Sequence, residues 1–164
     1  MDSFSVTPEP LLMPLFNTNS LLNCSATSLR NFLGRPANLP DISDPDIELE
    51  IVQAPAVIEV GEKIIFRVTA MGLRQRMTHE YLTASEFEIL ESLIEGPLPL
   101  WRHRQHLEAL SDNQCRLTDE VEFQPPGGLL RFVLTEQRIR ESLEAGMTFR
   151  YQALAERISS GALQ

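Results

Sequence analysis

Five segments between residues 63 and 124 are typical of β-strands and follow one another with only short connections. Turn-forming residues such as Gly72 and Gly96-Pro97 separate them. Connections this short join antiparallel neighbours, because a parallel pair needs a crossover of a dozen or more residues. We therefore predict an antiparallel meander, whose strands are Lys63 to Ala70, Arg74 to Ala84, Phe87 to Glu95, Leu100 to Ala109 and Cys115 to Gln124.

Two further strands are predicted nearer the N-terminus. The first is Leu15 to Cys24, although its asparagines weaken the β propensity. After Pro45 the pattern changes to period two, which indicates a strand with one buried face. Its apolar positions, Ile47, Leu49 and Ile51, alternate with acidic residues.

A short helix and a turn region are predicted between these two strands. Ser25 or Thr27 can cap a helix that runs through Leu33 and is ended by Gly34. The stretch from Arg35 to Pro45 contains three prolines, so we predict turns or a one-turn helix there.

A long amphipathic helix is predicted after the sheet, from Leu129 to Ile158. At 1.5 Å per residue, about thirty residues span roughly 45 Å, which is enough to cross a sheet. Gly146 lies in its middle, either to make room for a ligand or as a tolerated interior glycine. Strands followed by one terminal helix indicate an α+β fold with the helix on one face of the sheet. The apolar positions, mostly at steps of three or four, are Leu129, Phe132, Val133, Ile139, Leu143, Met147, Tyr151, Leu154 and Ile158.

Length and charge limit the class of protein. The 164 residues fit one domain, which we place at residues 15–160 after an extended, proline-containing arm of residues 1–14. Hydrophobic residues make up 43% of the chain, enough for a packed core. The net charge of −9 would repel phosphates and anionic lipids. We therefore predict neither nucleic-acid binding nor a stable membrane anchor.

Several common kinds of site lack their sequence patterns here. Cys24 and Cys115 are the only cysteines, which suggests reduced thiols and a cytoplasmic location rather than a disulfide framework. The region before Arg30 resembles neither a signal peptide nor a membrane span. His79 is isolated, and neither Cys-x-x-Cys nor His-x-x-x-His spacing occurs, so we predict no metal. Phosphate-loop, nucleophile-elbow and dinucleotide motifs do not occur either, so we predict no cofactor.

Two neighbouring strands carry the candidate site. Alternation places Trp101, His103, Gln105 and Leu107 on one face and charged residues on the other. A hairpin centred on Asp112 sets Gln105 opposite Asp119, so that His103 and Asp119 become diagonal neighbours. Such a pair can do general acid and base chemistry, or it can be a satisfied buried pair that fixes the strand register. The apolar companions of Asp119 on its strand face are Leu117, Val121 and Phe123.

Six short motifs stand in a characteristic order: Asn38-Leu39-Pro40, Gly96-Pro97, Trp101-Arg102-His103, Leu117-Thr118-Asp119-Glu120-Val121-Glu122-Phe123, Pro126-Gly127 and Phe149-Arg150-Tyr151. Together they resemble the SRPBCC superfamily, which includes START-like and polyketide-cyclase-like ligand-binding domains, over about Leu15 to Ile158. The resemblance implies a helix-grip fold, in which a seven-stranded sheet and the C-terminal helix enclose an apolar cavity. The motifs resemble most an uncharacterised subgroup of this superfamily, whose typical pattern is Trp-x-His-x-His-x-Phe. Here that pattern loses its second histidine at Gln105, and Gln152 replaces a common arginine. Both departures weaken an acid–base site.

Three functions remain open at this point. We favour a module that binds a hydrophobic small molecule, such as a lipid, polyketide, quinone or aromatic compound. One alternative is a cyclase, dehydratase or hydrolase that uses His103 and Asp119. The other is an interaction module with a filled core, whose N-terminal arm mediates pairing, as in a homodimer, or covers the pocket mouth. The residues expected to contact a ligand are Trp101, His103, Gln105, Asp119, Val121, Phe123, Leu143, Met147 and Tyr151.

Overall fold

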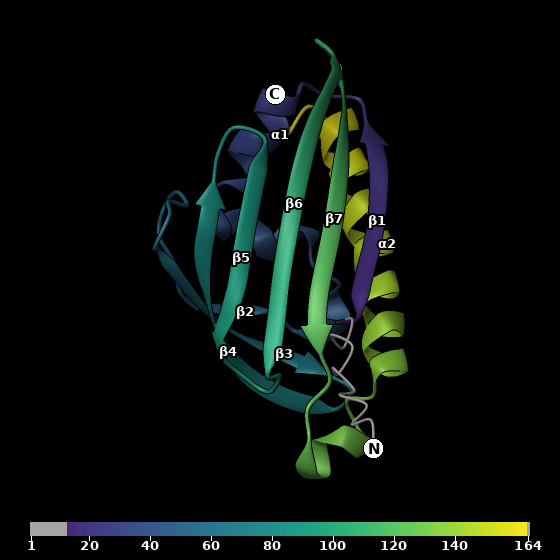
Figure 1. The fold of residues 1–164 in the computed structure, drawn as a ribbon. Helices are drawn as coiled ribbons and strands as arrows, with labels where there is room; N and C mark the ends of the chain where they lie inside the picture. Colours follow the sequence, from purple (N-terminus) through teal and green to yellow (C-terminus); the bar gives the residue numbers. More distant parts are fainter. Residues whose placement is uncertain (1–12, 164) are drawn as a thin grey trace, which may run out of the picture.

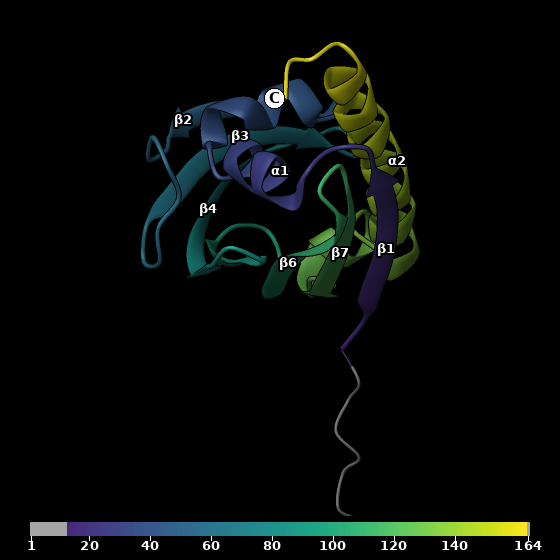
Figure 2. The ribbon, with the colours of Figure 1, turned by 90° about the horizontal axis from the view of Figure 1, so that it is seen from above.

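The computed structural model describes residues 13–163, and within them the chain forms one seven-stranded antiparallel sheet (Figure 1). The sheet order is β1-β7-β6-β5-β4-β3-β2, so the first strand pairs with the last and the rest form the predicted meander. Seen from above, the strands curve around a short helix, α1, and the long helix α2 lies beside β1 (Figure 2). The strands are β1 (Leu15–Leu22), β2 (Glu50–Gln53), β3 (Lys63–Ala70), β4 (Leu73–Ala84), β5 (Glu88–Glu95), β6 (Leu100–Ser111) and β7 (Gln114–Gln124).

The helices also follow the predicted order. Ser25 caps α1, because its side-chain oxygen accepts a hydrogen bond from the backbone amide of Ser28 at 3.0 Å. The proline-rich stretch after α1 forms two short 3₁₀ helices, which confirms the predicted turn region. The helices are α1 (Ala26–Leu33), the 3₁₀ helices η1 (Pro36–Ile42), η2 (Pro45–Ile47) and η3 (Gly128–Phe132), and α2 (Glu136–Ser159).

The predicted start of the long helix at Leu129 is wrong. Gly128 has a φ of +61°, and the residues after it form η3 instead of an α-helix. The α-helix begins only at Glu136, where the Thr135 side chain accepts a hydrogen bond from the backbone amide of Arg138 at 3.3 Å. Leu129 and Phe132 are consequently 86% and 65% exposed. Only the later part of the predicted apolar stripe faces the protein.

The strand predicted from Ile47 is also wrong in its first half. Asp44 accepts a hydrogen bond from the backbone amide of Asp46 at 3.0 Å, which stabilises the helical turn η2. Glu48 then adopts a left-handed conformation with a φ of +46°, so pairing starts only at Glu50. The first strand likewise ends at Leu22, two residues before the predicted end.

The two strands of the candidate site have the predicted faces and register. Gln105 pairs with Asp119, and His103 pairs with Val121. The inward residues of β6 from His103 to Leu107 are buried, whereas their outward neighbours are exposed. The pattern of alternation therefore identified the buried face of this hairpin correctly.

The core joins the sheet to both α-helices. Leu29 of α1, Leu117 of β7 and Leu154 of α2 are fully buried in one cluster with Cys115. The Sγ atoms of Cys24 and Cys115 lie 4.0 Å apart, within weak hydrogen-bonding distance and without a disulfide, so the two thiols are distant in sequence but adjacent in the fold.

The ends of the described chain are tied to the fold. The carbonyl of Pro14 accepts a hydrogen bond from the backbone amide of Phe123 at 3.1 Å. Leu163 is buried in the same cluster as Leu154. Most of the arm assigned to residues 1–14 lies outside the described residues. Over residues 13–163, no helix is long and apolar enough to cross a membrane.

Candidate functional site

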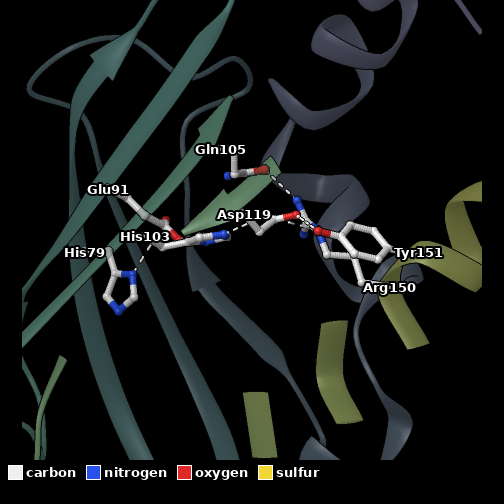
Figure 3. Close-up of polar contacts among 7 residues, drawn as sticks. All are labelled: His79, Glu91, His103, Gln105, Asp119, Arg150 and Tyr151. Atoms are coloured by element: carbon white, nitrogen blue, oxygen red, sulfur yellow. Dashed lines mark hydrogen bonds and ion pairs between the residues drawn. The ribbon is translucent and has the colours of Figure 1, made fainter. Parts of the chain in front are cut away.

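Four polar side chains form a row across the inner face of four adjacent strands (Figure 3). They are His79 on β4, Glu91 on β5, His103 on β6 and Asp119 on β7. The register sets Glu91 directly opposite His103, which brings the two side chains together. His79, His103 and Asp119 are 3%, 8% and 0% exposed, so this row is a buried network of titratable groups.

His103 lies between two carboxylates. Its Nδ1 is 3.2 Å from Oε1 of Glu91, and its Nε2 is 2.7 Å from Oδ1 of Asp119. Ionised carboxylates only accept hydrogen bonds, so both ring nitrogens must carry a proton. Burial lowers the pKa of His103, but the hydrogen bonds to Asp119 and Glu91 outweigh it and raise the pKa to about 9. The ring is therefore an imidazolium at neutral pH.

Asp119 is held by groups from the helix as well as from the sheet. Tyr151 of α2 donates its hydroxyl hydrogen to Oδ2 of Asp119 at 2.7 Å, and Nε of Arg150 lies 3.9 Å from Oδ1. Burial raises the pKa of Asp119, but the charges of Arg150 and His103 and the hydrogen bonds from His103 and Tyr151 bring it below its usual range. The carboxylate therefore links β7 to α2.

Arg150 and Glu91 complete the charge balance of the network. Nη2 of Arg150 donates to Oε1 of Gln105 at 2.5 Å. Burial raises the pKa of Glu91, but the hydrogen bond from His103 and the neighbouring His79 ring more than reverse this and leave it well below its usual value. Glu91 and Asp119 are thus both anionic, and they face the cationic side chains of His103 and Arg150. The buried charges cancel.

We expect His103 to titrate near pH 9 rather than 6.5 in a long-range ¹H–¹⁵N NMR spectrum of the imidazole nitrogens. The pKa of the folded state lies above the unfolded value. The resulting stabilisation, about 3 kcal/mol at most, is therefore complete below pH 6.5 and lost as the pH rises through 9. Glu91→Gln should lower the pKa of His103. Glu88→Gln, on the outer face of the same strand, should leave it unchanged. A titration of His103 near pH 6.5 in the unsubstituted protein would contradict the charged form.

A cavity of about 280 Å³ lies beside this network, between the sheet and α2. The 3₁₀ segment supplies Leu39 and Ile42, the inner sheet face supplies Phe66 and Met77, and α2 supplies Leu143, Gly146 and Met147. His79, Glu91, His103 and Arg150 reach the same space. The cavity therefore has mainly apolar walls and one charged, hydrogen-bonded side. Four further polar residues also line it: Ser43, Asp44, Gln75 and Ser142.

The predicted ligand contacts separate into three groups in the structure. Four of them line the cavity: Trp101, His103, Leu143 and Met147. Gln105 lines a smaller adjoining pocket of about 50 Å³, together with Arg150. The other four are not among the cavity-lining residues and pack behind its wall: Asp119, Val121, Phe123 and Tyr151. Asp119 influences the cavity indirectly, because it holds His103 and Arg150, which line it. Tyr151 in turn donates a hydrogen bond to Asp119.

Sequence reasoning did not assign Glu91 or Arg150 to the candidate site, and it left His79 without a role. Signals for the first two were present. Glu91 is the one acidic residue between Ile89 and Leu93 on the inner face of β5, and Arg150 stands at helical spacing between buried positions of α2. A charged residue on an otherwise apolar face is unusual unless it is paired. In β4, His79 is flanked on its face by Met77 and Tyr81, which gives no such signal.

The two departures from the superfamily pattern have different consequences. Gln105 replaces a histidine and accepts the hydrogen bond from Arg150, so it belongs to the network. Gln152 is exposed and donates to Glu156 at 3.1 Å, so that position contributes nothing to the cavity. Over residues 13–163, no group of three or more histidine, cysteine and acidic side chains is arranged to hold a metal ion.

A curved antiparallel sheet that holds a long C-terminal helix over an apolar cavity defines a helix-grip protein. No protein-family model matches the chain. A search of the curated proteins also gave no match. The class of this protein therefore follows from its three-dimensional structure.

Solved structures share this fold over most of the chain. A START superfamily protein from Mycobacterium smegmatis has a TM-score of 0.67 at 13% identity, over 89% of this chain and 97% of that one. Zhui aromatase/cyclase from Streptomyces sp. R1128 has a TM-score of 0.67 at 20% identity, over 88% and 94%. Norcoclaurine synthase from Thalictrum flavum has a TM-score of 0.61 at 11% identity, over 98% of both chains. The chain therefore has the helix-grip fold of these structures.

Proposed function

We propose that this protein binds a hydrophobic small molecule in the cavity between the sheet and α2. The observation that carries the proposal is an apolar cavity of about 280 Å³ with buried hydrogen-bonding groups on one side. Ligand sites in proteins are mainly apolar, with a few placed polar groups, and their volumes begin at about 300 Å³. The cavity therefore suits a compact molecule rather than a bulky one.

The charge balance of the buried network limits the charge of the ligand that the cavity can bind. Glu91 and Asp119 are matched by His103 and Arg150 without any contribution from a ligand. An added charge would be buried next to a network that is already neutral, which is costly in a low-dielectric interior. This supports a neutral ligand.

The hydrogen bonds of His103 favour binding over acid–base catalysis. Both of its ring nitrogens are occupied by carboxylates, so the ring has no lone pair with which to take a proton from a substrate. A general base needs a free acceptor within reach of the proton that it removes. Two of the similar structures carry the names of enzymes, a cyclase and a synthase, but the likeness to them supports only the fold.

The remaining alternative, an interaction module, required a core filled by side chains. The open volume next to Met77 and Met147 argues against a filled core. Well-packed interiors leave few voids larger than a water molecule. A cavity of this size is therefore more readily explained by an occupant.

Titration with the apolar fluorophore N-phenyl-1-naphthylamine tests the proposal. We expect saturable one-to-one binding with a Kd on the order of micromolar, and competition by other compact neutral apolar molecules. Native mass spectrometry of the purified protein should show a copurified small molecule or uptake of the fluorophore. The same spectrum separates a monomer from the homodimer considered above. Fluorescence that rises linearly without saturation would contradict a defined cavity site.

A further inference from the structure

His79 is the one histidine of the row whose ring nitrogens both lack a hydrogen-bond partner among the described residues. It is only 3% exposed, and it lines the cavity. Its ring is held edge-on against Phe66, with the centroids 4.8 Å apart. Buried polar groups without a partner are rare in native proteins and call for an explanation. A ligand in the cavity would provide the missing partner.

The position of Glu91 decides which kind of partner His79 needs. Nδ1 of His79 lies 3.5 Å from Oε2 of Glu91, which is long for a hydrogen bond but close enough for the carboxylate to favour a proton on Nδ1. The cationic ring of His103 already faces the same carboxylate, so a second buried cation would be unmatched. A neutral ring protonated on Nδ1 leaves Nε2 as an acceptor. Figure 3 shows this second nitrogen pointing away from Glu91.

We propose that the ligand carries a neutral hydroxyl group, a phenol or an alcohol, whose hydrogen is donated to Nε2 of His79. This inference rests on the proposed function and specifies the ligand class of the same cavity. An ether or a carboxylate offers no hydrogen to donate, and a carboxylate also adds an unmatched charge. A protonated amine can donate, but it adds a cation to a balanced network. A neutral hydroxyl group offers a hydrogen to donate and adds no charge to the network.

Three probes of similar shape separate these cases: naphthalene, 2-naphthol and 2-methoxynaphthalene. With the unsubstituted protein we expect 2-naphthol to bind about tenfold more tightly than 2-methoxynaphthalene, because one net hydrogen bond distinguishes them. In His79→Phe this preference should disappear, while naphthalene binding is kept, because phenylalanine retains the apolar contact with Phe66. His79→Gln keeps an acceptor oxygen and should retain part of the preference. It replaces the phenylalanine variant if circular dichroism shows that the latter does not fold.

Met77→Leu is the matched control, since Met77 lines the cavity two residues away on the same face of β4. It should change the binding of all three probes equally and leave the preference for 2-naphthol intact. Equal binding of 2-naphthol and 2-methoxynaphthalene by the unsubstituted protein, or a preference that survives in His79→Phe, would overturn the hydroxyl inference but leave the cavity site standing. Failure of all three probes to bind would overturn the proposed function together with it.

Discussion

Asp119→Ala is expected to lower the free energy of unfolding by about 3–5 kcal/mol, the range for removal of one partner of a buried ion pair. Asp119 is fully buried and accepts hydrogen bonds from His103 and Tyr151. Its loss leaves His103 with one carboxylate and removes the carboxylate that lies 3.9 Å from Nε of Arg150. Urea denaturation followed by circular dichroism measures the effect. The same variant should also lower the pKa of His103, because one of its two anionic neighbours is gone.

Glu122→Ala is the matched control for this experiment. Glu122 lies on the same strand but on the outer face, where its side chain is 37% exposed and 3.9 Å from Arg102. Exposed ion pairs contribute about 0–1 kcal/mol, so we expect a small change. Equal losses in the two variants would show that Asp119 is no more than an ordinary strand residue. A loss confined to Asp119→Ala would support the network that joins β7 to α2.

Gly146→Leu is expected to weaken fluorophore binding on the order of 100-fold or more without destabilising the protein. Gly146 lines the cavity, and a Cβ atom placed there would meet nothing within 4 Å. A leucine side chain would thus grow into the space that a ligand's apolar atoms need. Glycine inside a helix costs about 1 kcal/mol relative to alanine, so the free energy of unfolding should stay the same or rise. Fluorescence titration and urea denaturation of one preparation measure both quantities.

The neighbouring Ala145 provides the control, because it is exposed on the outer side of α2. Ala145→Leu places the same side chain on the same helix, outside the cavity, and should leave binding unchanged. If Gly146→Leu binds the fluorophore as well as the unsubstituted protein does, the ligand lies elsewhere. If both leucine variants lose binding, the helix itself has been disturbed.

Part of the candidate site could be predicted because one hairpin carries it. The alternation along β6 and β7 and the short turn between them fix which residues face inward and which residues pair, so His103 and Asp119 were correctly brought together. Glu91 pairs with His103 in the β5–β6 pair, whose register has no shift, so its position could have been found in the same way. His79 could not. The β4–β5 pair contains two register shifts, one of them beside His79. A bulge changes the pairing without a clear sequence signal, so the distance between these side chains depends on the folded sheet.

Local sequence patterns determined the class of structure: strand periodicity, short turns and a helical stripe specify an antiparallel sheet with one covering helix, because these patterns act between near neighbours. The start of α2 also depends on local signals, since the Thr135 cap and the turn at Gly128 outweigh the apolar residues Leu129 and Phe132. Only the tertiary structure decided which distant segments meet. It decided that β1 pairs with β7 and that Arg150 reaches Gln105. Above all, it decided the charge of His103. A ring nitrogen gains or loses its proton according to the groups around it, and those groups come from strands and a helix far apart in the chain.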